Sequence, residues 1–208
     1  MTSPLLARAA PVLIEGPAGA LEIAFHAPAQ PTALALICHP HPVHGGTMDN
    51  KVVQTLARGF VQLGYRALRF NVRGVGASAG SWDEGRGETH DALAVAAALR
   101  DPALPLAVGG FSFGAFVAAQ AATRLAAAGS PAERLVLVGP ATSRFAMPAV
   151  PADTVVIHGE ADEVVPLSAT LDWARPMTLP VIVLPGVGHF FHGQLPLLRT
   201  QLVQAWHR

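Results

Sequence analysis

The stretch from Leu104 to Gly129 constrains the fold of this chain more than any other. It begins with an apolar run, passes through the pentapeptide GFSFG at residues 110–114, and continues as an Ala-rich run without proline up to Gly129. This order predicts a buried strand, a sharp turn and a helix. A G-x-S-x-G sequence at such a turn is typical of a nucleophile elbow, in which a strained serine, here Ser112, projects above the sheet at the start of a helix.

The two glycines of the pentapeptide have a steric reason to be there. A side chain at Gly110 or Gly114 would collide where the predicted strand and helix pass close to each other. Backbone strain at Ser112 is tolerable where function uses it. The simpler alternative is an exposed serine in an ordinary tight turn, so an elbow requires an acid and then a histidine further along the chain.

After an initial hairpin, predicted strands and helices alternate along the whole chain. Such alternation favours a mostly parallel α/β sheet of about eight strands with helices on both faces. No internal repeat or linker interrupts it, so we expect one domain over residues 1–208, with residues 1–9 as a loose lead-in. The expected strands are 11–15, 20–26, 32–38, 65–72, 104–108, 134–138, 154–158 and 180–184. The expected helices are one that Asp49 or Asn50 caps and that runs to about 63, and those within 83–100, 113–129, 168–174 and 194–206.

Composition narrows the classes of function. Hydrophobic residues make up 51% of the chain and charged residues 13%, with a formal net charge of zero. No cluster of Lys and Arg favours nucleic acid or an anionic membrane as a partner. No apolar run approaches the roughly 18 residues of a membrane span, and the first residues do not resemble a signal peptide. The single cysteine, Cys38, excludes an internal disulfide and predicts a cytoplasmic protein. The apolar fraction leaves room for a dimer, so we expect a monomer or homodimer.

Two loops after predicted strands supply the acid and the histidine that the elbow requires. Asp162 lies in the loop after 154–158, and His189 lies in the loop after 180–184. The chain order is therefore serine, acid, histidine, as expected of the elbow fold. Because ligands in an open parallel sheet bind beyond the carboxyl ends of the strands, all three residues can meet at one edge.

Several stretches together make the chain resemble the α/β-hydrolases, and more narrowly the small lidless serine hydrolases related to dienelactone hydrolases. They are HPHPVHGGTMDNKVV, FNVRGVGASAG, GGFSFG, HGEADEVVP and GVGHFF, and they span residues 39–191. The resemblance implies an α/β-hydrolase fold, a Ser112–Asp162–His189 triad and no cofactor. Dienelactone hydrolases proper carry a cysteine nucleophile, where this chain has Ser112.

Each triad role has a rival nearby in the sequence. Glu160 and Glu163 flank the predicted acid, but Asp162 matches the family's G-x-x-D-x-x-V-P pattern. His192 follows His189 by three residues, and we prefer His189 because it comes directly after Gly-Val-Gly in the loop at the strand end.

An oxyanion hole needs two backbone donors aimed at the developing negative charge. One is the N–H of Phe113, the residue after the nucleophile. For the other, Pro40 and Pro42 have no N–H, so between them only His41 can donate, and the family resemblance points to the same loop.

Two further residues are candidate substrate contacts. His39 precedes the oxyanion loop, where its side chain can also buttress that loop, and Phe190 flanks the triad. We also expect Arg73 to tie loops together, and Asp91 to lie on a solvated face of the helix within 83–100.

The sequence thus predicts a carboxylesterase-like serine hydrolase of small or short-chain esters. The interval 139–152 is too short for a cap domain, so the site should be open and shallow. Thioesters, lactones or a small peptide bond remain alternatives because the acyl-transfer machinery is shared. Two other classes stay open: a non-catalytic binding module on a hydrolase scaffold, and a redox or metal enzyme that uses Cys38 with His39, His41 and His44. We expect no metal, because no carboxylate or cysteine stands among these histidines.

Overall fold

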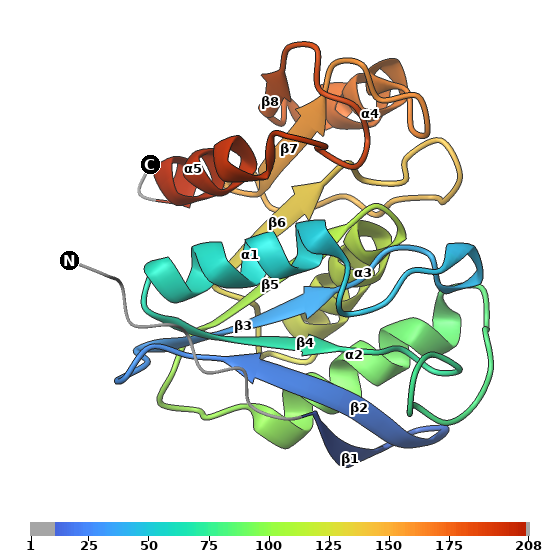
Figure 1. Cartoon of the computed structure of the whole chain (residues 1–208), viewed down its shortest axis with the longest axis vertical. Helices are drawn as coiled ribbons and strands as arrows, with labels where there is room; N and C mark the ends of the chain where they lie inside the picture. Colours follow the sequence, from blue (N-terminus) through green and yellow to red (C-terminus); the bar gives the residue numbers. More distant parts are fainter. Residues whose placement is uncertain (1–10, 207–208) are drawn as a thin grey trace.

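The computed structural model describes residues 11–206, so the expected lead-in at residues 1–9 lies outside the described part. Its centre is an eight-stranded, mostly parallel sheet, as predicted (Figure 1). The strands β1 and β2 form an antiparallel hairpin that pairs with β4, and the other pairings are parallel. In spatial order the strands are β1 (Val12–Gly16), β2 (Gly19–His26), β4 (Tyr65–Phe70), β3 (Ala33–Cys38), β5 (Leu106–Phe111), β6 (Arg134–Val138), β7 (Val155–Gly159) and β8 (Val181–Leu184).

Helices cover both faces of the sheet and give the molecule two hydrophobic layers. One layer is buried under α1 (Lys51–Gln62) and α5 (Leu195–Trp206), which run across the front of Figure 1. The other lies under α2 (Arg86–Leu99) and α3 (Phe113–Ala127) behind the sheet. A shorter helix, α4 (Leu167–Ala174), follows β7.

The central strands are hydrophobic on both faces because helices cover them on both sides. Every residue of β3 and β5 is buried, and their last paired residues are Cys38 and Gly110. The strand β5 continues through Gly109 and Gly110 as far as Phe111, beyond the predicted end at 108. The elbow therefore begins without an intervening loop.

The loop between β6 and β7 contains no helix or strand in its described residues, 139–154. No cap domain is inserted there, as predicted. Among residues 11–206, no helix is long and apolar enough to cross a membrane.

The expectation for Asp91 is wrong, whereas that for Arg73 is confirmed. Asp91 is fully buried on α2 and accepts hydrogen bonds from the Arg73 backbone N–H at 2.9 Å and from its guanidinium at 2.8 and 3.0 Å. The ion pair joins the loop after β4 to α2. The helix turns Asp91 inward, whereas its neighbour His90 lies on the exposed face.

Candidate active site

Ser112 lies at a strained turn between β5 and α3. Its φ of 56° and ψ of −120° fall outside the regions that side chains usually allow. A Cβ on Gly110 would overlap the Gly114 carbonyl, and one on Gly114 would overlap the Cys38 carbonyl at the end of β3. The steric reason given for both glycines is confirmed.

The structure brings Ser112, His189 and Asp162 together in one chain of hydrogen bonds. The Ser112 hydroxyl lies 3.0 Å from Nε2 of His189, and Nδ1 of His189 lies 2.6 Å from Oδ2 of Asp162. Since the carboxylate accepts from Nδ1–H, Nε2 is left as the acceptor for the serine proton. The three side chains come from the ends of β5, β8 and β7, at the carboxyl edge of the sheet.

The loop after β7 holds Asp162 as a carboxylate. Its Oδ1 accepts hydrogen bonds from the Val164 and Val165 amides at 2.9 and 2.7 Å. Burial alone would raise the pKa of Asp162, but the hydrogen bonds from His189 and these amides, with the charge on His189, hold the pKa below its usual value.

The rival residues point elsewhere. Glu160 accepts a hydrogen bond from the Gly186 amide at 2.9 Å, and Glu163 is exposed. His192 is also exposed, and its described ring contact is with Phe190 rather than with the serine.

A second histidine contacts the acid, and the sequence reasoning missed it. His158, fully buried on β7, places Nε2 2.9 Å from the Val165 carbonyl and 3.3 Å from Oδ2 of Asp162. Because both neighbours are acceptors, Nε2 carries the proton. Burial lowers the pKa of His158, although the Val165 carbonyl and the charge of Asp162 oppose this, so the ring is neutral. A spacing of four residues from a strand into a turn predicts no contact, so the sequence offered no signal for it.

His39 buttresses the oxyanion loop, and the substrate contact expected of it is not found. Its side chain is fully buried and does not line the pocket. Nε2 accepts from the Val72 amide at 3.1 Å, so Nδ1 donates to the Pro40 carbonyl at 2.7 Å. Burial lowers the pKa of His39 to about 4, although the Pro40 bond opposes this.

The two predicted oxyanion donors line the same pocket as Ser112. Among the described residues, the backbone N–H groups of His41 and Phe113 have no hydrogen-bond partner. The loop around His41 is held by its own carbonyl, which accepts from the His44 and Gly46 amides at 3.1 and 3.0 Å.

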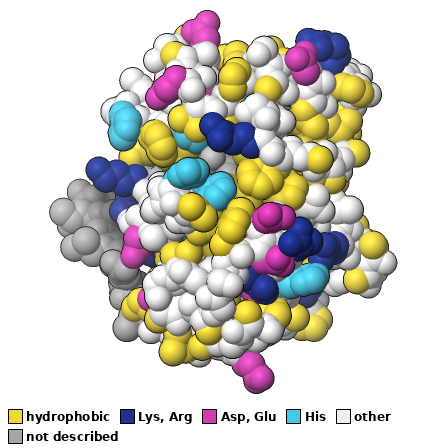
Figure 2. All heavy atoms as spheres, turned by 90° about the vertical axis from the view of Figure 1, so that its right-hand side faces the viewer, with side chains coloured by type: hydrophobic (Ala, Val, Ile, Leu, Met, Phe, Trp, Pro, Cys, Tyr) yellow, Lys and Arg dark blue, Asp and Glu magenta, His cyan; other side chains and the backbone are white. Residues whose placement is uncertain are grey.

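The pocket beside the serine has a volume of about 680 Å³ and is mainly apolar and aromatic. Figure 2 faces the carboxyl edge of the sheet and shows histidine and hydrophobic side chains gathered around a hollow, with a basic side chain beside them. Phe190 lines this pocket as predicted and packs edge-on against His189 at 5.0 Å. The lining residues are Pro40, His41, His44, Gly45, Gly46, Asn50, Ser112, Phe113, Ala141, Arg144, Phe145, Val164, Val165, His189 and Phe190.

Sequence reasoning did not assign Asn50 or Arg144 to this pocket. Of the two predicted caps of α1, the structure has Asn50, whose Oδ1 accepts from the Val52 amide at 2.8 Å. Arg144 lies in the irregular loop between β6 and β7, where no periodic pattern indicates which way a side chain points.

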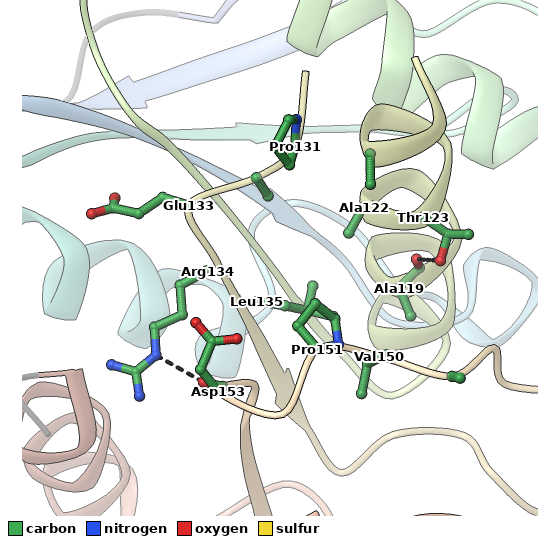
Figure 3. A pocket seen from close by; sticks show the side chains of 13 residues that line it. Ala119, Ala122, Thr123, Pro131, Glu133, Arg134, Leu135, Val150, Pro151 and Asp153 are labelled. Carbon is green, nitrogen blue, oxygen red and sulfur yellow. Dashed lines mark hydrogen bonds between the residues drawn. The ribbon is translucent and has the colours of Figure 1, made fainter. Parts of the chain in front are cut away.

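A second cavity, of about 460 Å³, lies between α3 and the loop before β7 (Figure 3). It flanks the C-terminal half of α3, at the opposite end of that helix from Ser112. Arg134 closes one end by donating to the Asp153 carbonyl at 2.8 Å. None of the predicted site residues lines it.

Cys38 and the histidine loop do not form a reactive cluster. Burial raises the pKa of the Cys38 thiol, so it stays protonated. Within residues 11–206, no group of three or more His, Cys, Asp and Glu side chains could hold a metal ion.

The sheet, the elbow and the short β6–β7 loop together define an α/β serine hydrolase without a lid. The family model described as serine aminopeptidase, S33, matches residues 35–152, which is more than half of the chain. The chain therefore belongs to this family and, with it, to the α/β-hydrolase superfamily.

Known relatives agree with this assignment over different lengths. XC6422 from Xanthomonas campestris, described as an α/β serine hydrolase without a lid, is 37% identical, with a TM-score of 0.89 over 99% of this chain and 97% of its own. An α/β serine hydrolase homologue from Coxiella burnetii is also 37% identical, with a TM-score of 0.83 over 96% of this chain and 98% of its own. The uncharacterized protein RP471 of Rickettsia prowazekii is 41% identical over 117 residues, which are 54% of this chain and only about half, 49%, of that protein.

Proposed function

We propose that this chain is a carboxylesterase-like serine hydrolase that cleaves small or short-chain acyl esters, with Ser112 as nucleophile. The observation that carries the proposal is the continuous hydrogen-bond chain from Ser112 through His189 to Asp162, at a strained elbow that opens into a pocket. Nucleophile, base and orienting carboxylate in hydrogen-bond reach are the signature of an activated serine.

In this mechanism, His189 Nε2 takes the Ser112 proton as the serine oxygen attacks the ester carbonyl carbon. The tetrahedral intermediate collapses when the C–O bond to the alcohol breaks, and His189 returns the proton to that leaving oxygen. Water, deprotonated by His189, then attacks the acyl-serine and releases the acid. Asp162 keeps Nδ1 protonated and stabilises the imidazolium in both half-reactions.

The His41 and Phe113 amides are proposed to hold the oxyanion. Both N–H groups lack an internal partner among the described residues, so they can donate to the substrate without breaking a bond. Such preorganised donors stabilise charge that develops only in the transition state.

The pocket favours an ester over the substrate of an aminopeptidase, the activity for which the matched family model is named. A free α-amino group is best recognised by a carboxylate, and the pocket lining contains no Asp or Glu. The open, lidless pocket favours short acyl chains. Thioesters and lactones remain alternatives, because their cleavage needs the same groups.

A fluorophosphonate probe followed by intact-protein mass measurement tests the proposal. We expect one adduct on the wild type and none on Ser112→Ala, together with hydrolysis of 4-nitrophenyl acetate and butyrate by the wild type only. Aminoacyl 4-nitroanilides should be poor substrates by comparison. A folded wild-type protein that takes no adduct and cleaves no ester would instead support the non-catalytic binding module.

A further inference from the structure

The pocket beside Ser112 is lined by basic side chains and by no acidic ones. Its lining includes Arg144 and three histidines but no Asp or Glu. Arg144 is the arginine of this lining, and among residues 11–206 its guanidinium makes no ion pair or hydrogen bond, whereas the exposed Arg86 and Arg175 pair with acids elsewhere on the surface. An arginine that faces a pocket without a partner has its donors available to a ligand.

The backbone of Arg144 is fixed over the pocket even though its side chain is exposed. The amides of Arg144 and Phe145 both donate to the Ala141 carbonyl, at 3.1 and 3.0 Å. The next ring, Phe145, packs against Phe116 at 4.9 Å and Phe113 at 5.2 Å. The guanidinium therefore stays within reach of the pocket.

Arg144 lies on the side of the pocket where the acyl group should bind. His189 protonates the leaving alcohol, so the alcohol lies toward His189 and its neighbour Phe190. Phe145, the residue after Arg144, lies instead beside His41 of the oxyanion loop, with ring centroids 6.1 Å apart. This places Arg144 on the side of the pocket away from the leaving alcohol. Burial lowers the pKa of His41, and the positive charges of His44 and Arg144 lower it further, as expected if these groups are close.

We propose that the preferred substrate carries a carboxylate at the end of its acyl chain, as in a half-ester of a short dicarboxylic acid, and that Arg144 binds this carboxylate. The inference rests on the proposed esterase function. A planar guanidinium binds a carboxylate through two parallel hydrogen bonds. An uncharged acyl chain of the same length makes no such contact.

The experiment compares two esters with five-carbon acyl groups, mono-4-nitrophenyl glutarate and 4-nitrophenyl valerate. The quantity measured is the ratio of kcat/KM for glutarate to kcat/KM for valerate. The two esters differ in intrinsic reactivity, but this difference is the same for every variant, so it cancels when the ratio is compared between variants. Arg144→Gln should lower the glutarate-to-valerate ratio about tenfold, mainly through the KM of the glutarate, while Arg144→Lys should keep part of it. Added salt should reduce the wild-type ratio and leave that of Arg144→Gln nearly constant.

The matched control is Arg124→Gln, which removes an exposed arginine near the far end of α3. It changes the net charge by the same amount and should leave the ratio as in the wild type. If Ser112 takes the fluorophosphonate and valerate is cleaved, but the ratio is unchanged in Arg144→Gln, the carboxylate inference is overturned while the esterase stands. If neither ester is cleaved and Ser112 is not labelled, both proposals fail.

Discussion

A buried histidine with no role in the usual triad lies beside Asp162 in the candidate site. Nε2 of His158 lies 3.3 Å from the same carboxylate oxygen that accepts from His189. Its N–H donates to the Val165 carbonyl at 2.9 Å, and the Val165 amide in turn donates to Oδ1 of Asp162 at 2.7 Å. His158 is therefore a positioning residue that holds the loop around the acid.

Replacing His158 by Leu should lower kcat for ester hydrolysis roughly tenfold and leave KM nearly unchanged. Leucine cannot donate to the Val165 carbonyl, so the amides that hold Asp162 are less well fixed and the acid orients His189 less well. His158→Gln, which keeps a side-chain N–H donor, should restore part of the loss. The measurement is kcat and KM for 4-nitrophenyl butyrate.

The control for this comparison is His192→Gln, which replaces an exposed histidine on the loop after β8. It should leave kcat as in the wild type. If His158→Leu is folded and its kcat equals that of the wild type, or if His158→Gln is no better than His158→Leu, the positioning role is contradicted.

At the scale of elements, the loop after β4 is tied to α2 by one buried ion pair. The Arg73 side chain is 13% exposed and that of Asp91 fully buried, and three hydrogen bonds join them. Removing one partner of a buried pair leaves the other charge without compensation.

Asp91→Ala should therefore lower the free energy of unfolding by about 3 kcal/mol. The structure supplies a matched surface pair, Asp172 and Arg175, whose side chains are 66% and 71% exposed. Asp172→Ala should cost less than about 1 kcal/mol. Urea unfolding of both variants measures the difference, and equal costs would show that the Arg73–Asp91 pair does not hold the loop.

The sequence predicts those features of the fold and the site that depend on a few neighbouring residues, and it does not predict those that depend on packing between distant segments. The elbow, the cap at Asn50 and the loops with Asp162 and His189 each lie within a few residues of a strand end or a helix start, so their places were predictable. The partners of Asp91 and His158 depend on which side of an element faces a neighbour, and packing across the sheet decides that. Arg144 lies in an irregular loop, where sequence gives no period from which to infer a direction.

For the molecule as a whole, burial of His39 against the oxyanion loop makes the free energy of unfolding depend on pH in the acid range. The fold keeps His39 neutral, with a pKa of about 4 against an ordinary value of 6.5. Between these two values the unfolded chain binds a proton at this residue that the folded protein does not. Since the unfolded state binds more protons in this window, stability falls as the pH drops from 6.5 toward 4.

His39→Gln isolates this contribution. A glutamine can still accept from the Val72 amide and donate to the Pro40 carbonyl, but it does not titrate. The wild type should lose up to about 2.5 kcal/mol more unfolding free energy between pH 7 and 4.5 than His39→Gln does. His90→Gln, which removes an exposed histidine, should follow the wild type. Urea unfolding at several pH values gives the comparison, and parallel curves for wild type and His39→Gln would mean that protonation of this ring does not drive acid unfolding.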